Sequence, residues 1–146
     1  MQILRLQTVT DAQLYDILAL MKELSAGIVV TPEMIRRAVE SPDTHFFALM
    51  ADDGRIIGTA SLCVFHSPTG SKAHIEDVVV LSSYRGRHLG KMLMEHLIEY
   101  ARKEFKEIDL SLTSRPQRVA ANQLYKSLGF CQRETNVYSM AIRPIE

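Results

Sequence analysis

The spacing of hydrophobic and polar positions predicts a chain that mixes strands and helices along its whole length. Alternating apolar positions, or short apolar runs, predict strands, and apolar residues three or four apart predict amphipathic helices. Strands are expected at residues 2–8, 46–51, 55–65, 73–81, 108–112 and 137–142, with a loop at 67–71; helices are expected between residues 10 and 27, from 32 to about 40, from about 89 to 103 and from 119 to 128. The order β-α-α-β-β-β-α-β-α-β predicts an α/β (α+β) fold with a mixed sheet of about six or seven strands and helices on both faces.

Several local signals support these boundaries. Thr10 followed three residues later by Gln13 is a capping-box pattern, and Thr31-Pro32 combines an N-cap residue with proline at the first helical position. The tripeptide 52–54, Asp-Asp-Gly, separates two apolar runs and predicts a β-hairpin. Gly58 lies inside the second of these runs, which indicates either a β-bulge or a close approach of another backbone.

Composition favours an ordinary globular protein. The 146 residues fit one compact domain, predicted to span residues 1–146, and 47% of them are hydrophobic and 23% charged. Lys plus Arg equals Asp plus Glu, 17 of each, so the basic excess typical of nucleic-acid binders is absent. The first residues lack a signal-peptide pattern, and no apolar run approaches the ~20 residues that span a bilayer, so we expect a cytoplasmic protein without nucleic-acid or membrane partners.

The cysteines and histidines give no sign of a metal centre. Cys63 and Cys131 are the only cysteines, and two cysteines without CxxC spacing form neither a disulfide framework nor a zinc site. Cys63, His66 and His74 could be imagined as a cluster, but their spacing fits no known ligand set. We therefore expect no bound metal.

The segment from residue 75 to residue 91 has the pattern of an anion site. An apolar strand runs into a basic, glycine-containing turn and then directly into a long amphipathic helix, whose first N–H groups lack partners and whose dipole adds positive potential. Arg85, Arg87 and Lys91 place three positive charges within seven residues of a neutral protein, and Gly86 and Gly90 would let a pyrophosphate approach the backbone. A solvated basic turn is the alternative interpretation. Neither the dinucleotide fingerprint GxGxxG nor the P-loop pattern GxxxxGK[ST] is present.

Residues 85–90, Arg-Gly-Arg-His-Leu-Gly, resemble the acyl-CoA signature [QR]-x-x-G-x-[GA] of the GNAT (Gcn5-related) N-acetyltransferase family. The preceding strand, residues 74–80, is similar to that of glucosamine-6-phosphate and polyamine acetyltransferases of the family. Residues 121–130, Ala-Asn-Gln-Leu-Tyr-Lys-Ser-Leu-Gly-Phe, resemble the second family signature, N-x-x-A-x-x-[LF]-Y-x-x-x-G-F. Two positions depart from the patterns: His88 replaces the inner glycine of the first, and Arg118 replaces the leading asparagine of the second.

The resemblance implies the GNAT acyl-CoA N-acyltransferase fold and a direct transfer of the acetyl group of acetyl-CoA to a primary amine in a ternary complex. The pantetheine arm would pair with the edge of the strand before the turn, with a backbone N–H near Val78 stabilising the oxyanion. The residues implied in coenzyme binding are Val78, Val79, Val80, Arg85, Gly86, Arg87, His88, Leu89, Gly90, Lys91, Asn122 and Tyr125. The final strand could also join a partner subunit in a homodimer.

The resemblance also implies roles for catalytic residues. Tyr125 matches the family's general acid, which protonates the departing thiolate. Glu76 and Asp77 lie in an otherwise apolar strand, where adjacent residues point to opposite faces, and Glu76 is the base we choose because polyamine acetyltransferases have a glutamate there. His74, Asp77 and ordered water remain open as alternatives.

Other functions stay open at this point. A CoA-binding regulatory or interaction domain could keep the turn and lose turnover, although the presence of Tyr125 and Glu76 favours catalysis. A nucleic-acid-binding domain is disfavoured by zero net charge and by the lack of an aromatic platform. No motif identifies the acceptor amine.

Overall fold

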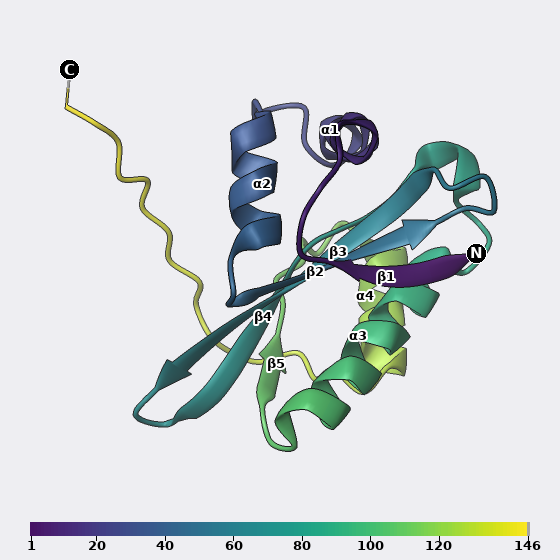
Figure 1. Cartoon of the computed structure of the whole chain (residues 1–146). Helices are drawn as coiled ribbons and strands as arrows, with labels where there is room; N and C mark the ends of the chain where they lie inside the picture. The colour runs from purple at the N-terminus through teal and green to yellow at the C-terminus, as the bar shows by residue number, and fades with distance from the viewer. Residues whose placement is uncertain (146) are drawn as a thin grey trace. The chain divides into compact units, whose positions relative to one another are not determined.

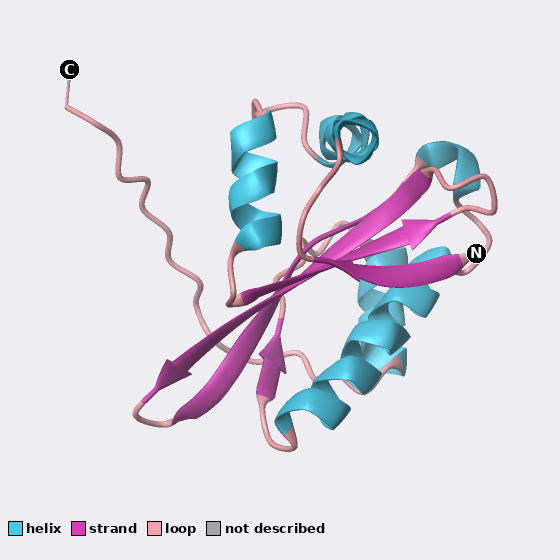
Figure 2. Ribbon diagram, in the orientation of Figure 1, coloured by secondary structure: helices cyan, strands magenta, loops and turns pink. Residues whose placement is uncertain are grey.

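The computed structural model describes residues 1–145. The chain divides into two compact units, the first from Met1 to Thr113 and the second from Ser114 onward. The first unit contains β1 (Gln2–Leu6), α1 (Asp11–Leu24), α2 (Pro32–Glu40), β2 (Thr44–Met50), β3 (Ile56–Ser67), β4 (Gly70–Val80), the short 3-10 helix η1 (Ser82–Tyr84), α3 (Leu89–Phe105) and β5 (Asp109–Ser111) (Figures 1 and 2). The second contains α4 (Val119–Ser127).

The first unit is built on one mixed sheet. Its five strands lie in the order β1-β2-β3-β4-β5, with antiparallel pairing from β1 to β4 and parallel pairing between β4 and β5. Helices α1 and α2 cover one face of this sheet and α3 covers the other (Figure 1). The predicted layered α/β architecture is confirmed, but the sheet has five strands rather than six or seven.

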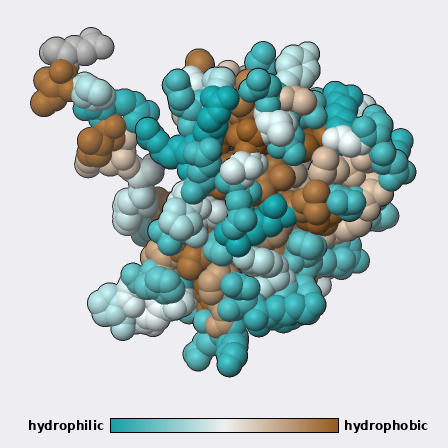
Figure 3. All heavy atoms as spheres, in the orientation of Figure 1, coloured by the Kyte–Doolittle hydropathy of each residue, from teal (hydrophilic) through white to brown (hydrophobic). Residues whose placement is uncertain are grey.

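The strand predicted at residues 137–142 is absent. Residues 130–145 form neither helix nor strand, and this extended segment carries both apolar and hydrophilic residues (Figure 3). Val137, Tyr138, Met140 and Ile142 are 74–87% exposed. The prediction failed because alternation only shows that a segment could present two different faces. A strand also needs a neighbouring backbone to pair with its N–H and C=O groups.

The predicted helix starts are confirmed at the level of single hydrogen bonds. The Gln13 backbone N–H donates to Thr10 Oγ1 at 3.2 Å, and the Thr10 N–H donates to Gln13 Oε1 at 2.9 Å, which is a complete capping box. Likewise the Met34 N–H donates to Thr31 Oγ1 at 3.2 Å, with Pro32 at the first helical position. Both helices therefore begin where side chains can satisfy otherwise unpaired amides.

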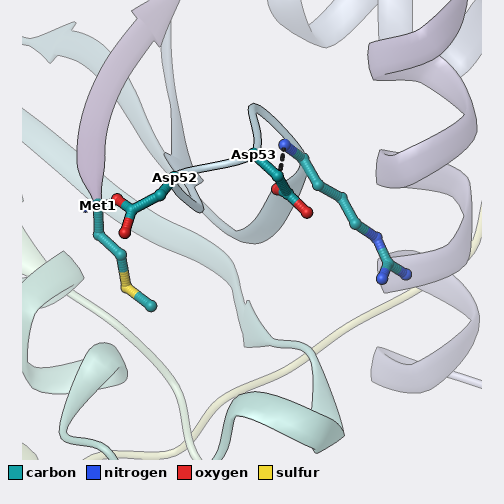
Figure 4. A network of polar contacts seen from close by, with 4 residues as sticks. Met1, Asp52 and Asp53 are labelled. Atoms are coloured by element: carbon teal, nitrogen blue, oxygen red, sulfur yellow. Dashed lines mark hydrogen bonds and ion pairs between the residues drawn. The ribbon is translucent and has the colours of Figure 1, made fainter.

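The two hairpin turns are set by local geometry. In the β2–β3 turn, Gly54 has φ +86° and the Arg55 N–H donates to Asp53 Oδ1 at 3.0 Å (Figure 4). The amine of Met1 also lies 2.6 Å from Asp52 Oδ1 in this turn. The predicted loop at residues 67–71 is shorter than expected. Strand β3 continues to Ser67 and β4 begins at Gly70, so only two residues connect them.

The core contains the predicted apolar stripes with shifted boundaries. The helical spacing predicts that the inner face of α1 consists of Leu14, Ile17, Leu18, Met21 and Leu24. In the structure Leu20 is completely buried, whereas Leu18 and Leu24 are only half-buried. In α3 the spacing predicts an inner face of Leu89, Met92, Leu93, His96, Leu97, Tyr100 and Ala101. It misses Met94, which is completely buried. These shifts arise because the exact rotation of a helix is decided by the side chains of the sheet beneath it.

Gly58 marks both a register shift and a close backbone approach. A Cβ atom at this position would lie 3.1 Å from the Val79 carbonyl oxygen and 3.2 Å from Leu93 Cδ1, so any other residue here would force these neighbours to shift by a few tenths of an ångström. The register between β2 and β3 also shifts beside it, between Leu49 and Met50. Both alternatives predicted for this glycine are thus present.

Candidate functional site

Strand β4 contains a β-bulge at the residues expected to meet the thioester. The pairing with β3 is regular up to Glu76 and resumes at Val79, so Asp77 and Val78 together lie opposite the single residue Ala60. Asp77 has φ +53°, the left-handed conformation found at the first position of one bulge type. The bulge bends β4 and interrupts its regular hydrogen bonding just before the basic turn.

Beyond His74, the outer edge of β4 has no strand paired with it within the first unit and is therefore open. Strand β5 pairs only with residues Lys72–His74. The Leu81 N–H donates to the Ile57 carbonyl at 2.8 Å, towards β3, and backbone groups alternate direction along a strand. Val80 therefore directs its N–H and C=O groups towards the open edge. This edge can accept an extended partner in the manner of an added strand.

The turn after β4 leaves amides accessible at the start of α3. Leu81 and Leu89 are buried on either side of it, and none of residues 82–88 is buried. His88 is the N-cap residue of α3 with φ +58°, and no side chain caps the helix there. A Cβ atom built at Gly86 or at Gly90 would meet no atom within 4 Å, so neither glycine is required by packing within the protein. The space beside these backbone amides is open to a ligand.

The positive charges of the turn are largely uncompensated. Arg85 Nε donates to the Val80 carbonyl at 3.3 Å, and the Arg87 guanidinium lies 5.2 Å from the centre of the Tyr84 ring. Neither arginine forms an ion pair within residues 1–145, whereas Lys91 Nζ lies 3.8 Å from a Glu95 oxygen. An uncapped helix N-terminus with two unpaired arginines beside it is suited to a phosphate or diphosphate.

The candidate bases lie at the bulge and just before it. The strict alternation expected for Glu76 and Asp77 does not extend across the bulge, and both residues are exposed. Nearby protein atoms still desolvate the Asp77 carboxyl and raise its pKa. His74 is held in place, since its Nδ1 lies 2.6 Å from Ser111 Oγ and its ring stacks on Phe65 at 5.2 Å.

The second unit carries the remaining predicted residues on α4. Tyr125 is half-buried and its ring lies edge-on to Phe130, with 6.3 Å between ring centres. Asn122 donates through Nδ2 to the Arg115 carbonyl at 3.0 Å, which ties the preceding loop to the helix and leaves Oδ1 available. The predicted helix end is confirmed at Gly129, whose φ is +102°. Residues 76–91 thus follow one another in the first unit, while Asn122 and Tyr125 belong to the second.

One contact of the turn had not been predicted. The Glu23 carboxylate, on the last turn of α1, accepts the Ser82 N–H at 2.9 Å and the Ser82 hydroxyl at 2.7 Å. These two hydrogen bonds lower the pKa of Glu23, the hydroxyl contributing most. The partners are 59 residues apart, and no local pattern could have indicated the contact.

The described residues hold neither a cluster of metal-binding side chains nor a helix suited to a bilayer. Residues 1–145 contain no group of three or more His, Cys, Asp or Glu side chains arranged to hold a metal ion. Within the same residues, every helix is too short or too polar to cross a bilayer. Cys63 is half-buried and Cys131 exposed, and both are free thiols.

Comparison with known proteins connects this geometry to a family. Residues 12–130 match the family model described as "Acetyltransferase (GNAT) family". The chain is 45% identical over 87 residues to a glucosamine 6-phosphate N-acetyltransferase of Trypanosoma brucei brucei, covering 56% of this chain and 54% of the relative. It is 34% identical over 84 residues to the protein of the same name from Arabidopsis thaliana, covering 52% and 56%. These alignments span about half the length of the curated relatives.

The likeness extends to solved structures. An acetyltransferase of Trypanosoma brucei superposes with a TM-score of 0.71 at 27% identity, over 96% of this chain and 99% of that one. The family model covers most of the chain, including the strand, the basic turn and the α4 helix described above. This chain is therefore a member of the GNAT family of acetyltransferases.

Proposed function

We propose that this protein transfers the acetyl group of acetyl-CoA to a primary amine. The observation that carries the proposal is the continuous arrangement along residues 78–91 of an open strand edge, a turn with two unpaired arginines and an uncapped helix N-terminus. A coenzyme with a diphosphate at one end of an amide-containing arm needs these features in this order. Family membership supplies independent support.

In the proposed complex, backbone groups of the protein make most of the contacts with the coenzyme. The free amides of Leu89, Gly90 and Lys91 would hold the diphosphate, helped by Arg85 and Arg87. The pantetheine arm would pair with the open edge at Val78 and Val80, which directs the thioester towards the bulge. The Val78 N–H would then donate to the oxygen that becomes negative during attack.

The chemical steps follow from what acetyl transfer requires. The amine must lose a proton before its nitrogen can attack the acetyl carbon, and the proposed acceptor of this proton is Glu76. The carbon–sulfur bond then breaks, and Tyr125 of the second unit is the proposed donor of a proton to the thiolate. A phenol is a suitable donor because its ordinary pKa is near that of the leaving thiol.

The names of the similar proteins indicate which acceptor amine to test first. Two of them are named as glucosamine 6-phosphate N-acetyltransferases, and a solved aminoglycoside acetyltransferase has a TM-score of 0.81 at 14% identity, which shows a shared fold only. Glucosamine 6-phosphate carries a primary amine and is the first acceptor to test. A panel should add aminoglycosides, polyamines and peptides with a free amino group.

The test combines binding with turnover. Acetyl-CoA that binds only the folded state should stabilise the protein by about 2.7 kcal/mol at a hundred times its Kd. Release of CoA thiol in the presence of each amine then measures catalysis. Binding without turnover of any amine would instead favour a CoA-binding regulatory domain, and the absence of binding would refute the proposal.

Charge-removal variants locate the coenzyme site. Arg85→Gln and Arg87→Gln should each raise KM for acetyl-CoA several-fold. Arg102→Gln is the matched control, because Arg102 lies near the other end of α3, about 20 Å away at 1.5 Å per residue, and pairs with Glu99 at 3.8 Å. That separation exceeds the screening length of about 8 Å at physiological salt, so the control should bind acetyl-CoA normally.

A further inference from the structure

The turn that would hold the coenzyme diphosphate has little packing of its own. Every residue from 82 to 88 is exposed except Tyr84, which is half-buried, and η1 has no side-chain cap from its own sequence. Exposed turns of this kind are usually mobile, because few buried contacts oppose their opening. A phosphate site built from backbone amides needs those amides held in position.

We propose that Glu23 is a positioning residue that orders this turn for coenzyme binding. The proposal rests on the function proposed above, but the contact itself does not. Both carboxylate oxygens of Glu23 are engaged by one residue, Ser82, through the backbone N–H at 2.9 Å and the hydroxyl at 2.7 Å. The carboxylate thereby supplies η1 with the N-terminal cap that its own sequence lacks.

The anchor side of this contact is rigid. Glu23 lies on the last turn of α1, close to Leu20, which is completely buried, and to Met21, which is 9% exposed. The contact therefore ties the exposed turn to a helix whose inner face is part of the core. A surface residue tied to the core can hold its partner in position although it is itself exposed.

The turn side of the contact leads directly to the coenzyme arginine. The Ser82 carbonyl accepts the Arg85 backbone N–H at 3.2 Å, and Arg85 Nε in turn donates to the Val80 carbonyl at 3.3 Å. Ser82 thus uses its N–H and hydroxyl for Glu23 and its C=O for Arg85. Loss of the Glu23 contact would release the residue on which the Arg85 backbone depends.

The charge of Glu23 by itself would weaken acetyl-CoA binding, which is opposite to the effect expected of a positioning residue. A carboxylate near an anion site repels the anion, and the field of Arg85 acts on Glu23. If Glu23 acted only through its charge, removal of that charge would strengthen acetyl-CoA binding. If it acts by ordering the turn, removal of the carboxylate weakens binding, so the sign of the effect separates the two roles.

The experiment measures acetyl-CoA affinity by calorimetric titration and steady-state kinetics for Glu23→Ala, Glu23→Gln, Ser82→Ala and the Glu23/Ser82 double alanine variant. We expect Glu23→Ala to raise Kd and KM for acetyl-CoA about fivefold while kcat at saturation stays within about twofold, since the contact is exposed and its effect is modest. Glu23→Gln should recover part of the affinity, because its carbonyl oxygen still accepts one hydrogen bond. The double variant should bind about as weakly as Glu23→Ala, which shows that the two residues act through one contact.

The matched control is Glu40→Ala, which removes an exposed glutamate from the end of the neighbouring helix α2. It should bind acetyl-CoA like the wild type. Unchanged or tighter binding by Glu23→Ala, with the wild type binding and turning over, would overturn this proposal and leave the proposed function intact. If the wild type itself failed to bind acetyl-CoA, both proposals would fall.

Amide hydrogen exchange gives a readout that needs no ligand. In Glu23→Ala, the amides of residues 82–88 should exchange faster than in the wild type, while those of α3 from Leu93 onward should be unchanged. Equal exchange over residues 82–88 would refute the ordering role whatever the kinetics show.

Discussion

The imidazole Nδ1 of His45 lies 2.6 Å from the hydroxyl oxygen of Tyr100, a contact that joins β2 to α3 across 55 residues of sequence. Arg5 of β1 also donates to this hydroxyl through Nη1, at 3.2 Å. His45 is only 8% exposed and packs edge-on against Phe105. A titratable side chain is therefore buried in a polar network at one side of the sheet.

This burial predicts a pH-dependent stability. Desolvation, with a smaller contribution from Arg5, lowers the pKa of His45 below 6.5, against the opposing effects of Glu104 and Asp43. As the pH drops below about 6.5, the unfolded state therefore binds more protons than the folded state. The contribution of neutral His45 to the free energy of unfolding is fully present above that pH and is lost as the pH falls towards the pKa of the folded state.

Urea unfolding at a series of pH values between about 5 and 8 measures this dependence. His45→Gln keeps a hydrogen-bonding side chain but cannot titrate, and it should reduce the slope of the unfolding free energy below pH 6.5. A variant with the full wild-type slope would show that His45 is not the group responsible.

Thr59 offers a stabilising substitution. Its side chain is completely buried, and its hydroxyl has no hydrogen-bond partner among the described residues. Thr59→Val keeps the shape and removes the cost of an unpaired polar group, so the unfolding free energy should rise by about 1 kcal/mol in urea titrations. The control Thr69→Val removes an exposed hydroxyl that accepts from Lys72 Nζ at 2.7 Å, and no gain is expected there.

His88 carries backbone strain in the turn between β4 and α3. Its φ of +58° is a conformation that glycine adopts freely and other residues adopt at a cost, which explains why the family signature has glycine at this position. His88→Gly should therefore raise the unfolding free energy by about 0.5–1 kcal/mol and keep acetyl-CoA binding. His88→Ala removes the same imidazole without relieving the strain. If thermal unfolding shows both variants equally stable, backbone strain is not the cause.

Glu76 and Asp77 can be separated as bases by isosteric substitution. If Glu76 accepts the amine proton, Glu76→Gln should lower kcat about a hundredfold, in the range of general-base losses, while Asp77→Asn costs less than tenfold. The raised pKa of Asp77 makes the comparison necessary, because a less acidic carboxylate is a stronger base. The reverse order of the two effects would move the assignment to Asp77, and small effects from both would favour water.

Tyr125 is tested by loss of its hydroxyl alone. Tyr125→Phe should lower kcat about a hundredfold while the Kd for acetyl-CoA stays within about twofold, because a proton donor acts in the transition state. Tyr138→Phe is the control from the same unit, at a side chain that is 87% exposed. Full activity of Tyr125→Phe across the pH range would refute its role as general acid.

Much of the fold was predictable because its signals are local. The capping box of Thr10 and Gln13, the cap at Thr31 and the hairpin at 52–54 each depend on residues a few positions apart, and all are present. The basic turn could be recognised for the same reason, since strand, turn and helix start follow one another in sequence. The orientation of Glu76 and Asp77 could not, because strict alternation assumes a strand without a bulge.

The amino-acid sequence by itself determined the order of the elements up to α4, the starts of the first two helices and the placement of Arg85 and Arg87 in the turn before α3. Tertiary structure alone decided the bulge at Asp77 and Val78, the pairing of Glu23 with Ser82 across 59 residues and the unpaired state of residues 137–142. The physical reason is the range of the interactions. Caps and turns are satisfied by neighbours along the chain, whereas a bulge, a capping contact from another helix and a strand each require a partner that only folding brings into place.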